Sequence, residues 1–217
     1  MLIIEKSIHP LTEFTPTWYL PFWVTVYPDE QKIDIMREWI LDNENKLIEK
    51  YSQNSKNDGG TGLGKHSLTA QYNSFNLFLE THNIKEFQDF FSFLKEEYNN
   101  FMQEFKTLNR RCVMYAWANV IRSGQAIQKH NHGAHHYAYI SGNIQFDNYK
   151  TKTRYFNPVN EMYYDFVNVK GGITFFPSYL NHCTTEHTEN KSRVSAAFDL
   201  FDINHIENTY ETNGVEF

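Results

Sequence analysis

The sequence has few cysteines and no long apolar run. Cys112 and Cys183 are the only cysteines among 217 residues, and two thiols so far apart form neither a cysteine zinc motif nor a disulfide framework. We interpret them as reduced thiols of a cytoplasmic protein. No stretch approaches about 18 uncharged apolar residues, so we expect no membrane span. The first residues lack the basic segment and apolar run of a signal peptide.

Basic residues are also in deficit. The chain has 20 Lys and Arg against 26 Asp and Glu, a formal net charge of -6. A nucleic-acid-binding surface needs clustered Lys and Arg to neutralise phosphates, so we expect no nucleic-acid partner. Aromatic residues are abundant instead, with 18 Phe and 14 Tyr, which indicates a Phe/Tyr-rich core. The length fits a single domain spanning residues 1–217.

Two segments of the first half have helical patterns. Apolar residues recur at near-helical spacing over 29–51 and again over 84–105, where Phe and Leu form one stripe. Before them, residues 1–28 contain Pro10, Pro16, Pro21 and Pro28, which favour extended segments. Between them, 58–64 (DGGTGLG) predicts a loop. The glycines lack the GxxxxGK[ST] pattern of a P-loop, so we interpret this segment as a surface or lid loop.

From Arg111 onward the pattern changes to period two. Strands are expected at 112–121, 136–146, 153–156, 172–177 and 192–201, separated by polar turns. Helices first and strands later predict an α+β fold. We expect residues 1–110 to form a mainly helical buttress on one outer face of an antiparallel barrel or sandwich built from 111–201. The polar segment 202–217 is expected to be loosely held.

Three histidines and an Arg-x-Ser motif carry the chemistry. His130 and His132 share one face if their segment is extended, and two imidazoles on one face can begin an iron, copper or zinc site. In a chain with ten His, this signal is weak alone. It gains from the apolar segment 172–177, the Pro-led turn that ends at His182, and the following Arg193 and Ser195. A guanidinium matches a carboxylate and stays charged when buried, and Ser adds a hydroxyl donor.

These motifs, in this order, resemble the 2-oxoglutarate/Fe(II) oxygenases, which carry HxD/E…H on a double-stranded β-helix and often R-x-S after the distal His. The resemblance is closest to small oxygenases of this superfamily in tailed phages of marine bacteria (cyanophage type). It covers roughly residues 58–200 and rests on Thr61–Gly64, Trp117–Asn119, His130–Gly133, Asn157–Asn160 and Phe176–Leu200.

The resemblance implies a jelly-roll, cupin-like double-stranded β-helix with N-terminal buttressing helices. It implies that His130, His132 and His182 hold Fe(II) and that Arg193 and Ser195 hold 2-oxoglutarate. Tyr139 and Asn119 are further candidates for contact with this cosubstrate. The expected reaction is hydroxylation of a small-molecule or peptide substrate by dioxygen, with succinate and CO2 as coproducts. We expect it in the cytoplasm, that of the host if a phage encodes the chain.

One departure keeps alternatives open. His132 stands where Asp or Glu is usual in the 2-His-1-carboxylate triad, so the iron centre would be one unit more positive. One alternative is a cupin-like three-His dioxygenase without 2-oxoglutarate, in which Arg193 binds the substrate's own carboxylate. Another is a non-catalytic jelly-roll binding or structural phage protein. Arg193 has a simpler interpretation too, an ion pair with Asp199 or Asp202. His135 and His136 either touch the site or are exposed loop residues.

Overall fold

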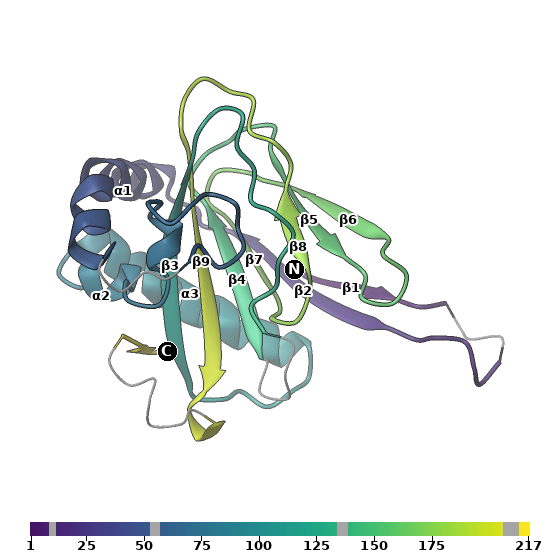
Figure 1. The fold of residues 1–217 in the computed structure, drawn as a ribbon. Coiled ribbons are helices and arrows are strands. Elements are labelled where there is room, and N and C mark those ends of the chain that lie inside the picture. Colours follow the sequence, from purple (N-terminus) through teal and green to yellow (C-terminus); the bar gives the residue numbers. More distant parts are fainter. Residues whose placement is uncertain (9–11, 53–56, 134–138, 206–212) are drawn as a thin grey trace.

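The computed structural model describes residues 1–8, 12–52, 57–133, 139–205 and 213–217, and it arranges them in three layers (Figure 1). Helices form the first layer, a large antiparallel sheet the second and a small antiparallel sheet the third. His135, His136 and the start of the strand expected at 136–146 lie outside the described residues. No helix in the described part of the chain is long and apolar enough to cross a membrane.

The large sheet has seven described strands, and every neighbouring pair is antiparallel. In spatial order they are β1 (Leu2–Lys6), β2 (Tyr19–Val26), β7 (Gly172–Pro177), β4 (Ile140–Gln145), β9 (Arg193–Asp202), β3 (Cys112–Ile121) and β10 (Val215–Glu216). The small sheet has the order β6 (Tyr163–Val167), β5 (Lys152–Phe156) and β8 (His182–Thr184). An isolated bridge between His130 and His182 adds one more segment beside β8.

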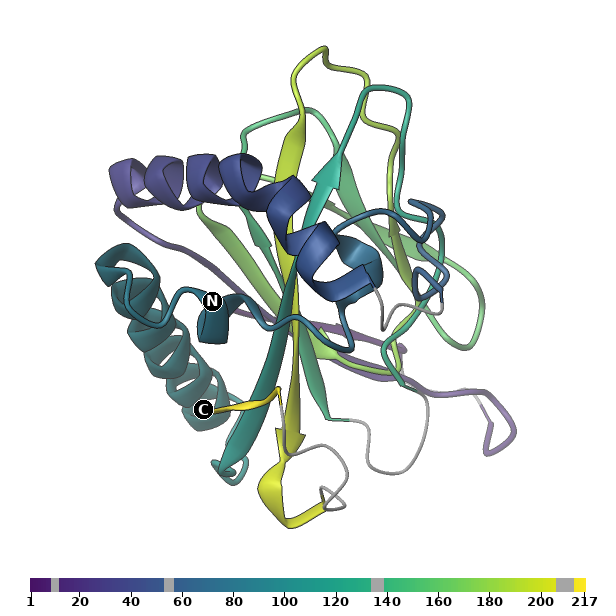
Figure 2. The same ribbon diagram turned by 60° about the vertical axis from the view of Figure 1, so that its left-hand side comes forward.

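Two long helices cover the outer face of the large sheet, as Figure 2 shows. They are α1 (Glu30–Tyr51) and α3 (Lys85–Glu104); α2 (Leu77–Glu80) and a 3-10 turn (Thr69–Gln71) lie between them in the chain. The Asp29 side chain begins α1 by accepting a hydrogen bond of 3.1 Å from the Lys32 amide. Both helices predicted from the apolar stripe are confirmed within one residue at each end.

Strand alternation sorts the side chains of the large sheet between two environments. On β9, Val194, Ala196 and Phe198 are fully buried in the main core beneath the helices, whereas Arg193 and Ser195 face the small sheet. The main core needs Gly142 on the neighbouring strand β4, because a Cβ there would stand 2.1 Å from the Phe198 ring. The space between the sheets is therefore where the polar residues of β9 gather.

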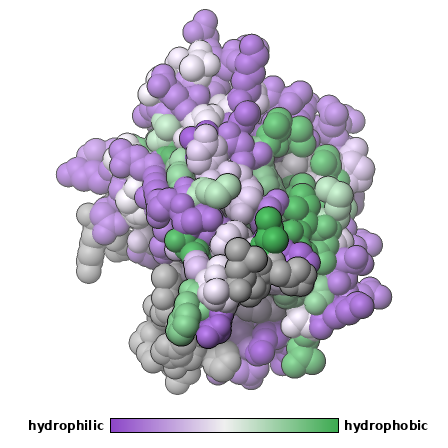
Figure 3. Space-filling model, turned by 90° about the vertical axis from the view of Figure 1, so that its right-hand side faces the viewer, coloured by the Kyte–Doolittle hydropathy of each residue, from purple (hydrophilic) through white to green (hydrophobic). Residues whose placement is uncertain are grey.

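A second, smaller apolar cluster fills the other part of the space between the sheets. It contains Leu20, Phe22, Tyr155, Phe176 and Leu180. At the open side of the two sheets a groove is lined by apolar side chains, among them Ile3, Val24 and Phe166, and by polar ones, among them Asn143, Gln145 and Asn168. Figure 3 shows strongly hydrophobic side chains gathered on this side of the molecule. This apolar cluster adjoins the polar pocket, since the Phe176 ring lies 4.8 Å from that of His182 and the Tyr155 hydroxyl accepts from Asn143.

The structure corrects two expectations about the ends of the chain. Residues 1–110 are not simply a helical buttress, because β1 and β2 extend the large sheet through pairing of β2 with β7. In the tail, Val215 pairs with Met114, and Phe217 is buried with its ring 5.6 Å from those of Phe91 and Tyr98. Short strands with mixed exposure, such as β6 and β8, give too few period-two positions to stand out in the sequence.

Candidate functional site

Backbone pairing brings the two halves of the histidine motif together. The His130 amide donates to the His182 carbonyl at 3.0 Å, and the His130 carbonyl accepts from the His182 amide at 2.8 Å. The His132 amide donates to the Ser178 carbonyl at 3.0 Å. The segment is therefore extended beside β8, which puts His130 and His132 on one face. The ring centroid of His182 lies 4.5 Å from that of His130 and 4.9 Å from that of His132.

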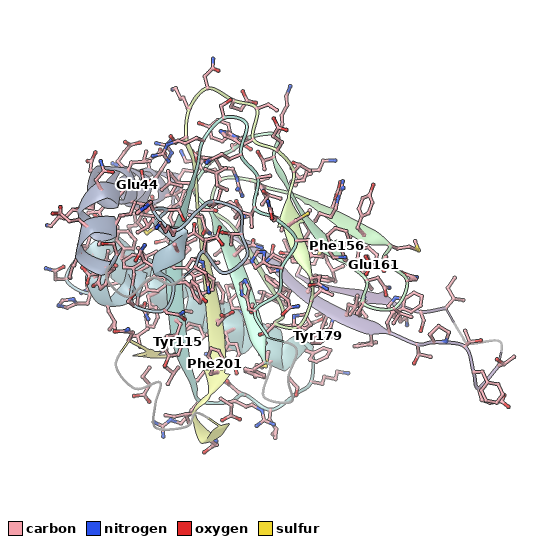
Figure 4. The ribbon with its side chains drawn as sticks, in the orientation of Figure 1. Glu44, Tyr115, Phe156, Glu161, Tyr179 and Phe201 are labelled. Atoms are coloured by element: carbon pink, nitrogen blue, oxygen red, sulfur yellow. The ribbon has the colours of Figure 1, made fainter. Side chains whose placement is uncertain are left out.

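A side-chain contact fixes this segment to the small sheet. Lys129 donates to Glu161 at 2.6 Å, and its ammonium lies 4.3 Å from the centre of the Phe156 ring. Figure 4 shows Phe156 and Glu161 together on the β5–β6 hairpin. The residue that precedes the His130-Asn131-His132 run is thus held against the sheet that also carries His182.

Each of the three imidazoles has a hydrogen-bond partner at Nδ1. His130 Nδ1 lies 2.8 Å from the Gln128 carbonyl and His182 Nδ1 lies 3.0 Å from the Leu180 carbonyl. His132 Nδ1 lies 2.7 Å from Asp199 Oδ1. Since these oxygens accept, each Nδ1 carries a proton, and Nε2 is the nitrogen through which each ring can bind a metal.

These Nε2 atoms lie close together. The Nε2 atoms of His130 and His132 are 3.3 Å apart, and the three residues offer ligand nitrogens within 4.8 Å of one another. Burial lowers the pKa of His130 to about 4, with His132 adding to the effect, and burial likewise places the pKa of His182 well below its ordinary value. Three imidazole nitrogens this close together, two of them on rings whose burial disfavours the protonated form, are a donor set that fits a divalent transition metal.

Arg193 lies in the same pocket as the histidines, between the two sheets. The residue is only 2% exposed, and Nη2 donates to Gln145 Oε1 at 2.6 Å. Nη1 is buried with no partner among the described residues. Gln145 in turn donates to Asn143 Oδ1 at 3.2 Å, and Asn143 donates to the Tyr155 hydroxyl at 2.5 Å. A chain of polar side chains that runs from β9 to β4 and on to β5 of the small sheet therefore holds one nitrogen of the guanidinium and leaves the other open.

The simpler interpretations of Arg193 fail on geometry. Asp199 bonds His132, and Asp202 accepts from Arg110 at 2.5 Å. Burial lowers the pKa of Arg193 to about 10, and only the more distant Asp147 opposes that effect. Asp147 itself accepts from Arg37 at 2.5 Å and from the Val194 amide at 2.6 Å. The guanidinium is therefore a buried cation whose charge has no contacting anion among the described residues.

Ser195 and Asn119, both predicted to contact the cosubstrate, line this pocket and are paired neighbours on β9 and β3. Asn119 Oδ1 accepts from the Thr69 hydroxyl at 2.8 Å. Tyr139 does not lie there. Its hydroxyl is 2.7 Å from that of Tyr98 on α3 and 3.5 Å from the sulfur of Met102. The expected contact of Tyr139 with a cosubstrate is therefore corrected, because its side chain packs toward the helix layer.

Tyr115, Trp117 and Asn119 alternate along β3, and two of them line the pocket. Trp117 and Asn119 do so, with the Trp117 ring 5.2 Å from that of His132. Tyr115 lies at the other end of the strand, 5.7 Å from the Phe201 ring (Figure 4). The pocket thus occupies only one end of β3.

Sequence reasoning missed Asp199 and Ser141 as parts of the site. Asp199 Oδ1 accepts from the Ser141 hydroxyl at 2.5 Å as well as from His132, and the two residues are register partners on β9 and β4. The sequence could have indicated Asp199, because residues an even number of positions apart on a strand share a face, and Asp199 is four positions from Ser195 and six from Arg193. Gln145 is found only once the register of β4 against β9 is known.

A second hollow adjoins the histidines. It is lined by Asp58, Gly59, Thr61, Thr69, Tyr72, Trp117, His130, Asn131, His132 and Asp199. The glycine-rich loop forms one wall, where Asp58 accepts from the amides of Gly60 at 3.1 Å and Gly64 at 2.9 Å. The Thr61 carbonyl accepts from the Gln128 amide at 2.8 Å. The loop is therefore anchored next to the histidine segment rather than freely exposed.

Comparison with known proteins gives structural likeness only. No family model and no curated protein sequence matches the chain. A prolyl-4-hydroxylase from Pseudomonas putida is similar at a TM-score of 0.54 and 10% identity, covering 83% of this chain and 91% of that one. AviO1 from Streptomyces viridochromogenes is similar at a TM-score of 0.53 and 8% identity, covering 86% of this chain and 91% of that one. SnoK, a non-heme α-ketoglutarate-dependent carbocyclase from nogalamycin biosynthesis, has a TM-score of 0.49 and 8% identity, covering 83% of this chain and 79% of that one. The first two likenesses show that the chain shares their fold.

Proposed function

We propose that this protein is a 2-oxoglutarate-dependent Fe(II) oxygenase built on a double-stranded β-helix. Its chain passes from β3 in the large sheet to the His130 segment in the small one, back to β4, on to β5 and β6, and so through β7, β8 and β9. This alternation between two facing antiparallel sheets supports the jelly-roll assignment. The fold shared with the prolyl-4-hydroxylase supports it independently.

The observation that carries the proposal is a metal-binding constellation and an unsatisfied buried cation in one pocket. In this proposal His130, His132 and His182 hold iron through Nε2. Arg193 Nη1, which lacks a partner in the described protein, takes one oxygen of the distal carboxylate of 2-oxoglutarate, and Ser195 donates its hydroxyl beside it. Iron loaded with 2-oxoglutarate would supply the oxidising chemistry with dioxygen as the oxidant, one oxygen atom going to succinate, formed with CO2, and the other to the hydroxylated substrate.

The chain's own residues then have three tasks. Gln145 fixes Arg193 so that its free nitrogen is aimed before the cosubstrate arrives. The oxygens at each Nδ1 fix the tautomers of the three ligands. The second hollow, between the glycine-rich loop and Trp117, would admit the prime substrate next to the metal while the loop and the rings of Tyr72 and Trp117 limit the access of water.

A three-His dioxygenase that needs no 2-oxoglutarate is the second candidate. It is favoured by one observation, the presence of His132 where the triad has a carboxylate. In that case Arg193 would bind a carboxylate of the substrate itself. The two candidates share the metal and differ in the coproduct.

Succinate formation separates them. Protein with Fe(II), ascorbate, dioxygen and 2-oxoglutarate, but no prime substrate, should release succinate slowly, measured by mass spectrometry. Arg193→Ala should abolish this release. Arg193→Lys should retain part of it, because an ammonium keeps the charge but replaces only part of the paired N–H donors of a guanidinium. Arg154→Ala is the matched control, because that arginine pairs with Asp165 in the small sheet away from the pocket. Iron binding without succinate formation in the wild type would favour the second candidate.

A further inference from the structure

The three ligand histidines differ in the group that their Nδ1 atoms contact. His130 and His182 face neutral backbone carbonyls, whereas His132 faces the carboxylate of Asp199. His132 is also the residue at the position where the usual triad has a carboxylate ligand. Among the described residues, the carboxylate of Asp199 is thus the one charged group that contacts Nδ1 of a ligand histidine. The ligand that it contacts, His132, is the one that replaces a negatively charged carboxylate of the usual triad.

The carboxylate is committed to this contact. Its Oδ1 lies 2.7 Å from His132 Nδ1 and 2.5 Å from the hydroxyl of Ser141, a residue that is 0% exposed. The side chains of His132 and Asp199 are 5% and 13% exposed. No Lys or Arg of the described chain forms an ion pair with Asp199. Its negative charge is therefore directed at the metal position through a single imidazole ring, which the neighbouring ring of Trp117 helps to orient.

We propose that Asp199 supplies, from behind His132, the negative charge that a carboxylate ligand supplies in a 2-His-1-carboxylate site. This inference rests on the proposed function for its metal and cosubstrate. With Asp199 included, the charges of Fe(II) and Arg193 are balanced by those of the 2-oxoglutarate dianion and the aspartate. Without it, one positive charge remains uncompensated in a pocket where charge is expensive to bury.

The inference makes Asp199 a positioning residue that acts on iron through His132. A carboxylate on Nδ1–H fixes the ring and raises the basicity of Nε2, and loss of such a partner typically weakens metal binding about 10- to 100-fold. Greater electron donation also stabilises Fe(III) relative to Fe(II), so the carboxylate lowers the reduction potential. A purely structural role would leave that potential unchanged.

The test uses Asp199→Asn, because Asn keeps an oxygen that accepts from His132 and removes only the charge. Anaerobic Fe(II) titration of the full chain should show affinity reduced about 10- to 100-fold, and voltammetry should show a higher Fe(III)/Fe(II) potential. Asp165→Asn makes the same change on β6, at an aspartate that pairs with Arg154. It should leave the Fe(II) affinity and the reduction potential unchanged. Circular dichroism should show that both variants are folded.

A second background makes the test decisive. His132→Asp places a carboxylate at the ligand position itself, so adding Asp199→Asn to it should leave Fe(II) affinity unchanged or raise it by removing repulsion between two carboxylates. Equal losses in both backgrounds, or wild-type affinity and potential in Asp199→Asn alone, would overturn the inference. Fe(II) binding that depends on Asp199 without any 2-oxoglutarate turnover would preserve it and reject the proposed function. A wild type that binds no Fe(II) would overturn both.

Discussion

Arg193 brings a positive charge into the space between the sheets, where Nη1 has no partner among the described residues. Burial lowers its pKa to about 10 from 12.5. The unfolded chain therefore holds this proton more tightly, so the destabilisation is fully present at neutral pH and is relieved only as pH rises above about 10. The native state without ligands thus keeps a cation at a cost in stability, which is consistent with a site prepared for an anion.

The corresponding prediction concerns Arg193→Met. Removing a buried, incompletely paired charge while keeping side-chain length should leave the free energy of unfolding of the metal-free protein unchanged or raise it by about 1–4 kcal/mol. Urea denaturation at neutral pH measures this. Arg154→Met, which removes a partly exposed ion pair with Asp165, should change stability by less than about 1 kcal/mol. A loss of several kcal/mol in Arg193→Met would mean that the guanidinium is structural.

The histidine ligands give a second prediction at this scale. His182→Ala should reduce iron content from one per chain to near zero, because two remaining imidazoles hold a divalent metal poorly. Metal analysis after anaerobic loading and desalting measures it. His66→Ala is the control, since His66 is exposed and outside the constellation. Unchanged iron content in a folded His182→Ala protein would refute the assignment of this ligand.

Among the elements, the glycine-rich loop is the one most directly connected to the site. Asp58 accepts from the amides of Gly60 and Gly64, and the Gly64 bond is the main reason its pKa lies below the ordinary value. Gly62 has a φ of +77°, and a Cβ there would stand 2.6 Å from the Gln128 side chain. The loop therefore needs both the carboxylate and the glycine to lie against the segment that leads to His130.

We predict that Asp58→Ala loosens the loop without removing iron. Loss of hydrogen bonds to a charged acceptor costs about 1.5–3 kcal/mol, so hydrogen exchange of amides 59–64 should accelerate more than about 10-fold. Hydrogen–deuterium exchange with mass spectrometry measures it, and the α3 amides serve as the internal control. Protection equal to that of the wild type would show that the loop is held by other contacts.

The C-terminal residue Phe217, which follows β10, packs in the main core against α3. Phe217 is 8% exposed and packs on Phe91 and Tyr98. Phe217→Ala should lower the free energy of unfolding by about 3 kcal/mol, at the lower end of buried Phe truncations, while Fe(II) affinity stays unchanged. Denaturation and metal titration of the same sample check the two statements. A simultaneous loss of iron binding would show that the tail and the site are coupled.

For the whole molecule, the sequence predicted side-chain positions best where residues suited to metal or carboxylate binding also recur at the two-residue spacing of a strand. The i, i+2 spacing of His130 and His132 and the parity of Arg193 and Ser195 placed four side chains in one pocket. Tyr139 was assigned wrongly because β4 begins at Ile140, so the residue before it does not follow the alternation of the strand. The partners Asp199 and Gln145 depend on the register between β9 and β4, which arises from pairing distant in the sequence.

The central claim is that one pocket holds both Fe(II) and 2-oxoglutarate. Anaerobic titration with Fe(II) and then 2-oxoglutarate, followed by visible absorption, tests it most directly. We expect a metal-to-ligand charge-transfer band that saturates at one equivalent of each. In Arg193→Ala the band should need at least about 30-fold more 2-oxoglutarate, since truncating a buried charge that pairs with a ligand costs 2 kcal/mol or more. Iron binding with no such band in the wild type would contradict the account.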